Sequence, residues 1–176
     1  MNVEVEIRSF ISKEKYEELI EFFKREGTFV NEDCQETYYF DCKEDLRIQQ
    51  NNFFSKVWLK KGKMHDECRE EIEVQFDKKY FTMLESLFVS LGFPVRIKWF
   101  RKRHTFTYQG LTVMLDDTKG YGYIIELEKM SSEQDKEKNL EVVKNTVSTL
   151  HIPLTPKEEF DKKFQHYEEH WKELID

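Results

Sequence analysis

Alternation of apolar and charged residues is the feature of this sequence that most limits how the chain can fold. Residues 3–8 read Val-Glu-Val-Glu-Ile-Arg, and successive side chains of a β-strand point to opposite faces of a sheet. One face of a strand here is therefore apolar, while the other carries two carboxylates and a guanidinium group. Residues 67–76 repeat the pattern. A sheet built from such strands has one face to bury and one strongly charged face.

The sequence predicts an α+β fold with eight strands and four helices. Strands are expected at residues 3–8, 35–41, 46–49, 53–60, 67–76, 94–108, 111–117 and 121–129. Amphipathic helices are expected at residues 13–25, 78–90, 133–150 and 157–174. The short turns Gln109-Gly110 and Lys119-Gly120 favour an antiparallel sheet. The first helix is expected to cover the apolar face of the first strand.

Two arrangements of this sheet are open on the residues alone. An open sheet would leave the charged faces in water. Alternatively, the eight strands close into an antiparallel barrel with helices packed outside and a charged interior. The amphipathic helices favour the barrel, because the only apolar face they can cover lies opposite the charges. Such an interior must be solvated, internally paired or filled by a charged ligand, since burying unpaired charge is costly.

The basic strand at residues 94–108 does not follow simple alternation. Arg101 and Arg103 have the same parity as Ile97 and Trp99. Either the two apolar side chains plug one end of the barrel, or a bulge near Trp99 switches the faces of the strand.

Length, charge and cysteine content narrow the class of protein. The 176 residues suit one domain over residues 1–176, with a tunnel barrel over about 3–129 and a helical tail over about 131–175. The net charge of −7 argues against a nucleic-acid partner. No apolar run could span a bilayer and no signal-peptide pattern is present, so we expect a cytoplasmic monomer or homodimer without a membrane partner. The three cysteines lack C-x-x-C spacing, which disfavours a disulfide framework or a cysteine zinc site.

An ordered series of charged motifs resembles a known family. The motifs are Glu4-x-Glu6-x-Arg8, Leu46-Arg47-Ile48, Lys60, Arg69-x-Glu71-x-Glu73, Arg101-x-Arg103, Leu115-Asp116 and Gly122-x-x-x-Glu126-x-Glu128. Each motif is weak alone, but their order resembles the CYTH superfamily, also called triphosphate tunnel metalloenzymes. This superfamily groups class IV adenylyl cyclases with thiamine triphosphatases and inorganic triphosphatases.

The resemblance implies a charged tunnel that binds a triphosphate-containing small molecule together with Mg²⁺ or Mn²⁺. The implied metal ligands are Glu4, Glu6, Glu126 and Glu128, whose oxygens are the donors that hard cations prefer. The implied triphosphate-binding residues are Arg8, Arg47, Lys56, Lys60, Arg69, Arg101 and Arg103. The implied catalytic residues are Arg8, Lys60 and Asp116, and the additional tunnel acids are Glu71 and Glu73.

Three positions depart from the family pattern. Arg8 stands where the family has lysine, Gln49 stands where a second arginine is usual, and Arg101 begins an Arg-Lys-Arg sequence where Lys-x-Arg is frequent. Triphosphate binding is still expected despite these changes, whereas the turnover rate and the choice of substrate can differ from those of the family.

The expected function is phosphohydrolase action on inorganic triphosphate, thiamine triphosphate or a nucleoside triphosphate. One alternative is a class IV-type adenylate cyclase that makes cyclic AMP and pyrophosphate from ATP. Another is a non-catalytic module that binds polyphosphate or nucleotides. Trp58 is interpreted either as a stacking partner for a base or thiazole ring or as a packed aromatic residue.

Overall fold

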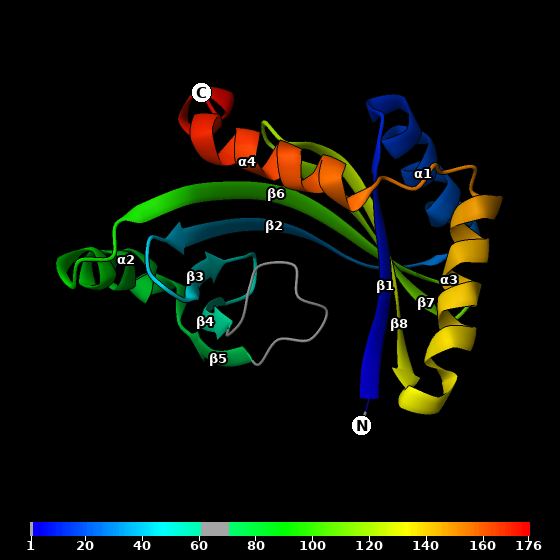
Figure 1. The fold of residues 1–176 in the computed structure, drawn as a ribbon, viewed down its shortest axis with the longest axis horizontal. Coiled ribbons are helices and arrows are strands. Elements are labelled where there is room, and N and C mark those ends of the chain that lie inside the picture. Colours follow the sequence, from blue (N-terminus) through cyan, green and yellow to red (C-terminus); the bar gives the residue numbers. More distant parts are fainter. Residues whose placement is uncertain (1, 61–70) are drawn as a thin grey trace. The chain divides into compact units, whose positions relative to one another are not determined.

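The computed structural model describes the backbone of residues 2–60 and 71–176, and the side chains of residues 5–59 and 72–176. The strands are β1 (Asn2–Ile11), β2 (Thr28–Phe40), β3 (Asp45–Gln50), β4 (Ser55–Lys60), β5 (Glu71–Phe76), β6 (Val95–Tyr108), β7 (Leu111–Thr118) and β8 (Gly122–Ser132). The α-helices are α1 (Lys13–Glu26), α2 (Phe81–Ser90), α3 (Lys136–Thr149) and α4 (Lys157–Leu174). Short 3-10 helices, η1 (Lys78–Tyr80) and η2 (Glu133–Asp135), precede α2 and α3 (Figure 1).

In the described part of the chain the strands form one sheet in the order β1-β8-β7-β6-β2-β3-β4-β5. The pairs β1–β8, β7–β8, β2–β3, β3–β4 and β4–β5 are antiparallel. The predicted α+β fold with eight antiparallel strands is thus confirmed. In the described part of the chain β1 and β5 stand at the two ends of the strand order, so the sheet is not closed into the full barrel that the sequence predicts.

The chain divides into two compact units. The first unit contains residues 1–32 and 102–167, and the second contains residues 33–101 and 168–176. Strands β2 and β6 and helix α4 contribute residues to both units. The predicted division into a barrel and a helical tail stays a prediction. Among the described residues, no helix combines the length and apolar character required to cross a bilayer.

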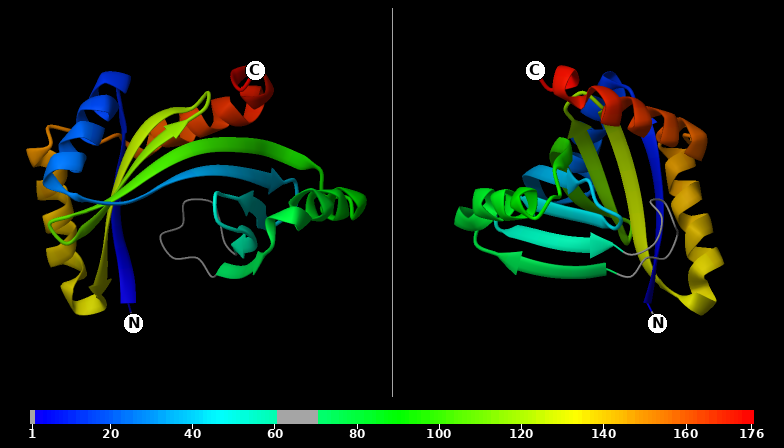
Figure 2. Two further views of the ribbon diagram at one scale, coloured as in Figure 1. Left: turned by 180° about the vertical axis from the view of Figure 1, so that it is seen from behind. Right: turned by 60° about the vertical axis from the view of Figure 1, so that its left-hand side comes forward.

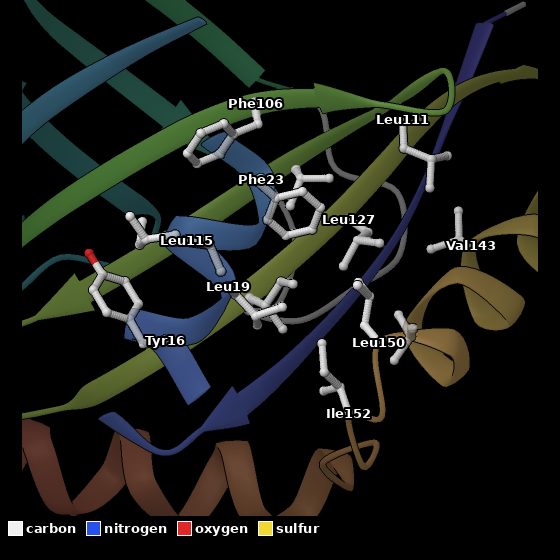
Figure 3. Close-up of a cluster of buried hydrophobic side chains, with 14 of the residues drawn as sticks. Tyr16, Leu19, Phe23, Phe106, Leu111, Leu115, Leu127, Val143, Leu150 and Ile152 are labelled. Atoms are coloured by element: carbon white, nitrogen blue, oxygen red, sulfur yellow. The ribbon is translucent and has the colours of Figure 1, made fainter. Parts of the chain in front are cut away.

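Two helices cover the apolar face of the first unit. Helix α1 packs on β7 and β8, whereas α3 packs on β1 and β8 (Figures 1 and 2). The core between them includes Leu19, Phe23, Leu127 and Val143, each at most 1% exposed (Figure 3). The expectation that the first helix covers the first strand therefore needs correction. Helix α3 follows β8 closely in the chain, so it folds back over β8 and over its partner strand β1.

Helix α1 begins and ends where the sequence predicts. The Ser12 hydroxyl accepts a hydrogen bond from the backbone N–H of Lys15 at 3.2 Å and so caps the N-terminus of the helix. Gly27 ends the helix, and its N–H donates to the carbonyl of Phe23. A Cβ at Gly27 would lie only 3.0 Å from that carbonyl and 3.1 Å from the carbonyl of Thr107. This close approach explains why the residue is glycine.

In the second unit, α2 packs on β3 and covers a core cluster of Tyr38, Phe40, Ile48 and Phe81. The opposite face of the strands is polar, as the alternation predicts. Arg47 lies directly opposite Trp58, and Trp58 lies directly opposite Glu73 in the register of β3, β4 and β5.

Strand β6 switches faces, as one of the two sequence interpretations proposed. Val95 packs against the core cluster of the second unit. Lys98 lies on the same side, with its Nζ 3.3 Å from Glu85 of α2 and 4.0 Å from the centroid of the Tyr38 ring. Residues 95 and 98 of a regular strand would point to opposite faces, so the change occurs between them. Arg101 consequently lies on the polar side, hydrogen-bonded to Gln35.

Candidate functional site

Carboxylates gather on the charged face of the first unit, on β1 and β8. Glu6 is directly opposite Glu128, and Arg8 is directly opposite Glu126. Directly opposed residues of antiparallel strands share one face, with Cβ atoms about 4.5–5.5 Å apart. Glu6 is exposed, while Glu126 and Glu128 are half-buried. Three of the four predicted metal ligands therefore lie on one face of two neighbouring strands.

Arg103 of β6 is tied into this face by two acids. Its Nε donates to Oδ1 of Asp116 at 2.7 Å and its Nη2 to Oδ2 of Asp116 at 2.8 Å. Its Nη2 also lies 3.2 Å from Oε2 of Glu126. Asp116 has a side chain only 3% exposed, and Arg103 uses both of its oxygens. In this arrangement Asp116 orients Arg103, and its predicted catalytic role stays a prediction.

The guanidinium of Arg103 remains charged although it is well buried. Burial alone would lower the pKa of Arg103, but the hydrogen bonds to Asp116 and the charges of Asp116, Glu126 and Glu128 together raise this pKa above its ordinary value. The first unit thus holds a permanent cation beside carboxylates, an arrangement that can bind both a phosphate oxygen and a metal ion.

The donor chemistry of the first unit fits a hard divalent cation. Directly opposed carboxylates such as Glu6 and Glu128 repel each other across a sheet, and a bound cation would offset this repulsion. Within residues 5–59 and 72–176, no three His, Cys, Asp or Glu side chains are already grouped closely enough to hold an ion. The Glu4 side chain lies outside the described residues, and its backbone pairs with Met130, two residues beyond Glu128. These residues fit Mg²⁺ or Mn²⁺ by donor type and strand register.

Arg8, which departs from the family pattern, contacts an aromatic side chain of α4. Its Cζ lies 5.0 Å from the centroid of the Phe160 ring, and Phe160 stacks on Phe10 with ring centroids 4.5 Å apart. Phe10, Arg8 and Glu6 share a face of β1 by alternation. Helix α4 thus packs Phe160 within the first unit, next to one of the predicted catalytic residues.

In the second unit, Arg47 is held by an acid that the sequence did not single out. Its Nε and Nη2 each donate to Asp45 at 2.6 Å, and its Nη1 donates to the Tyr39 hydroxyl at 3.2 Å. The guanidinium also lies 4.2 Å from the Tyr39 ring centroid and 5.7 Å from that of Trp58. A phosphate that binds Arg47 would have to share it with Asp45.

Trp58 is 5% exposed, which supports its interpretation as a packed aromatic residue. Lys56 lies over the Trp58 ring, with its Nζ 4.6 Å from the centroid, and pairs with Glu73 at 2.7 Å. The predicted tunnel residues Lys56 and Glu73 therefore satisfy each other in the second unit.

Two glutamines take part in the polar face of the second unit. Gln49, which replaces a family arginine, is buried and donates to the Thr37 hydroxyl at 2.8 Å. Gln35 accepts hydrogen bonds from Arg101 and donates to Asp33. Sequence reasoning missed Gln35 and Asp33 because it began this strand at residue 35 and weighed mainly charged residues.

Four predicted site residues fall outside the described side chains. They are Glu4, Lys60, Arg69 and Glu71. The backbone of Lys60 pairs with Asp45 and Glu71. The roles expected for these four residues stay predictions.

A separate polar chain lies on the helix-covered face of the first unit. The Tyr16 hydroxyl is 3.1 Å from Nδ1 of His104, and Nε2 of His104 is 2.7 Å from Oε2 of Glu32. Burial lowers the pKa of His104 below its ordinary value, and the charge of Glu32 offsets this only in part. Because this face is opposite the carboxylates, the hydrogen-bonded series Tyr16–His104–Glu32 connects α1, β6 and β2 and is not part of the candidate site.

Comparisons with known proteins identify the family of the chain. The CYTH domain model matches residues 2–164. A proposed adenylate cyclase of Methanocaldococcus jannaschii is 30% identical over 166 residues, which cover 85% of this chain and 90% of that protein.

Solved structures share the fold. A Pyrococcus horikoshii protein has a TM-score of 0.70 at 20% identity, covering 88% of this chain and 96% of that one. A proposed adenylyl cyclase from Hippeastrum, described as having a dominant triphosphatase activity, has a TM-score of 0.65 at 18% identity and covers 87% of this chain and 89% of that one. The predicted resemblance is confirmed: this chain belongs to the CYTH domain family.

Proposed function

We propose that the protein is a divalent-metal-dependent phosphohydrolase that acts on a triphosphate-containing small molecule. The observation that carries the proposal is the pairing of carboxylates on β1 and β8, where Glu6 faces Glu128 and Glu126 lies two residues away. Arg103 supplies a buried, charged donor beside them. Acidic residues that attract a cation, next to a cation that attracts phosphate, suit a metal–triphosphate complex.

In this proposal Glu6, Glu126 and Glu128, together with Glu4, hold Mg²⁺ or Mn²⁺. When bound, the ion neutralises charge on the phosphate oxygens and favours ionisation of a water nucleophile. Arg103 binds a phosphate oxygen, and Asp116 keeps its guanidinium oriented. Arg8 is a second phosphate-binding cation of the first unit. Among the second unit's residues, we propose Arg47, Lys56 and Arg101 as further phosphate contacts.

Hydrolysis is favoured over cyclisation because the charged residues recognise a phosphate chain, whereas cyclisation also requires a positioned nucleoside. Trp58 is buried under Lys56, and Tyr39 lies against Arg47, so neither ring presents a stacking surface for a base. The Hippeastrum neighbour, with its described triphosphatase activity, supports the same choice. The Methanocaldococcus jannaschii relative, a proposed adenylate cyclase, makes cyclase activity the second candidate.

Product analysis separates the candidates. The pure protein is incubated with tripolyphosphate, thiamine triphosphate or ATP, each with Mg²⁺ or Mn²⁺, and phosphate, pyrophosphate and cyclic AMP are resolved. Release of phosphate from at least one substrate is expected. Cyclic AMP from ATP would instead establish a cyclase, and tight binding without any product would identify a binding module.

Removal of a metal-binding carboxylate should abolish the activity. Glu6→Gln and Glu126→Gln are each expected to reduce kcat/KM by about 100-fold or more, because a lost ligand removes several kcal/mol of charge stabilisation. Glu141→Gln, an exposed glutamate of α3, is the matched control and should leave the rate unchanged. Full activity in either tunnel variant would overturn the metal assignment.

A further inference from the structure

Gln35 bridges a guanidinium group and a buried carboxylate in the second unit. Its Oε1 accepts hydrogen bonds from Nε of Arg101, at 2.9 Å, and from Nη2 of the same residue. Its Nε2 donates to Oδ2 of Asp33 at 2.9 Å. Asp33 is 5% exposed, and its Oδ1 accepts the backbone N–H of Asn52 at 2.9 Å. The bridge is therefore anchored to the turn between β3 and β4.

The chemistry of its two neighbours makes Gln35 hard to replace. A guanidinium group only donates hydrogen bonds and an ionised carboxylate only accepts them. The residue between Arg101 and Asp33 must therefore accept on one side and donate on the other. A glutamine amide does both, and these partners fix which end of the amide faces Arg101.

Gln35 differs in charge from the hydrogen-bond partners of two other arginines in the predicted site, Arg47 and Arg103. Arg47 is gripped by both oxygens of Asp45, and Arg103 by both oxygens of Asp116. Gln35 makes a comparable two-point contact with the Nε edge of Arg101. Because an amide is neutral, Gln35 orients the fork without adding a negative charge beside it.

We propose that Gln35 is a positioning residue for triphosphate binding: held by Asp33, it fixes the guanidinium of Arg101 for contact with a phosphate group. The inference rests on the proposed function, in which Arg101 binds phosphate. A lysine at position 101, where the family frequently has one, would lack the Nε–H and Nη2–H groups that Gln35 binds in Arg101. The proposal thus pairs the arginine at position 101 with the glutamine at position 35.

Titration calorimetry with inorganic tripolyphosphate tests the inference on the full chain. EDTA is present, so that metal-dependent turnover does not interfere. Gln35→Met, which keeps the side-chain length but removes all three side-chain hydrogen bonds, should raise Kd about tenfold, the usual cost of losing a hydrogen bond to a charged group. Gln35→Glu should raise Kd at least as much, because a carboxylate competes with phosphate for Arg101.

A double-mutant cycle distinguishes positioning from a general structural role. In an Arg101→Ala background, Gln35→Met should change Kd by less than about twofold, because the residue it positions is absent. Gln134→Glu makes the same charge change at an exposed residue of η2 and should leave Kd within about twofold of the original chain. Thermal unfolding of each variant confirms that it is folded.

Each outcome decides a separate point. If Gln35→Met weakened tripolyphosphate binding equally in the original chain and in the Arg101→Ala variant, Gln35 would not act by positioning Arg101. Loss of binding on Arg101→Ala with no effect of either Gln35 variant would also overturn it, while leaving the proposed function intact. Failure of the unsubstituted chain to bind tripolyphosphate both in EDTA and in the presence of Ca²⁺ would refute the proposed function, and the inference would fall with it.

Discussion

Asp116 is a carboxylate that Arg103 needs for its own burial. Both oxygens of Asp116 accept from the guanidinium, and both side chains are largely shielded from water. Asp116→Asn would leave a buried cation with a neutral partner that cannot accept at both positions. We expect a loss of about 3 kcal/mol in the free energy of unfolding, near the lower end for a broken buried ion pair because Glu126 remains. Urea denaturation measures this loss.

The neighbouring acid provides the control for this prediction. Asp117 points to the opposite face of β7 from Asp116 by strand alternation. Because Asp117 lies on the face away from Arg103, Asp117→Asn should cost only about 1 kcal/mol, the usual effect of a point substitution. Equal losses for the two substitutions would show that the pairing with Arg103 does not carry the stability.

At the residue scale, sequence alternation predicts the face of a side chain but not its partner. Glu6, Glu126, Arg103 and Asp116 were all expected on one charged face, and β1, β7 and β8 carry three of them in matching register. The contact of Arg103 with Asp116 depends on the order of β6 and β7 in the sheet. That order, and the exposure of each acid, cannot be read from a period of two residues.

At the scale of elements, a series of contacts centred on the titratable side chain of His104 joins α1 to the sheet of the first unit. Tyr16 of α1, Glu32 of β2 and the nearby lysines Lys102 and Lys24 all act on His104 of β6. Because burial lowers the folded-state pKa of His104 below 6.5, the unfolded chain takes up a proton more readily as the pH falls. This contribution to stability is present above about pH 6.5 and is lost below it.

His104→Gln should therefore make stability less dependent on pH. Between pH 7 and pH 5, the free energy of unfolding of the original chain should fall more steeply than that of the variant. Denaturant titrations at several pH values compare the two slopes. His166→Gln, at an exposed residue of α4, should keep the original slope. A slope unchanged by His104→Gln would show that this imidazole does not control the acid response.

Element boundaries show where local sequence signals suffice. Helix α1 matches its prediction closely because a serine cap and a glycine stop mark its ends. Strand β2 begins at Thr28, well before the predicted residue 35. Residues 31–33 are Asn, Glu and Asp, which have low β-propensity. They are nevertheless held in the strand, where Glu32 pairs with Lys102 and His104, contacts that no local pattern reveals.

The face switch in β6 illustrates a second limit of local reasoning. One of the two sequence interpretations placed the switch near Trp99, while the contacts of Val95 and Lys98 place it slightly earlier. Strand alternation shows that apolar and charged residues of β6 would fall on the same face of a regular strand. It does not locate the change, because that depends on which residues α2 covers.

At the scale of the whole molecule, the proposed site predicts that ligand binding raises the thermal stability of the folded chain. A ligand that binds only the folded chain stabilises it by about 2.7 kcal/mol at a concentration 100 times its Kd. For a chain of 176 residues, 1 kcal/mol shifts Tm by roughly 2–4 °C. Saturating tripolyphosphate with Ca²⁺, as a cation for a binding measurement, should therefore raise Tm by about 5–10 °C.

The variants assign this shift to particular groups. Glu126→Gln should remove the part that requires the cation and keep the part seen with tripolyphosphate in EDTA, because the phosphate-binding arginines remain. Arg103→Met should reduce both parts, since it removes a proposed phosphate donor. Glu141→Gln should retain the full shift, and sulfate at equal ionic strength should give little of it, because screening alone does not reproduce a multidentate contact. A cation-dependent shift that survives Glu126→Gln undiminished would exclude this carboxylate from the metal site and move the search for ligands to other acids of the chain.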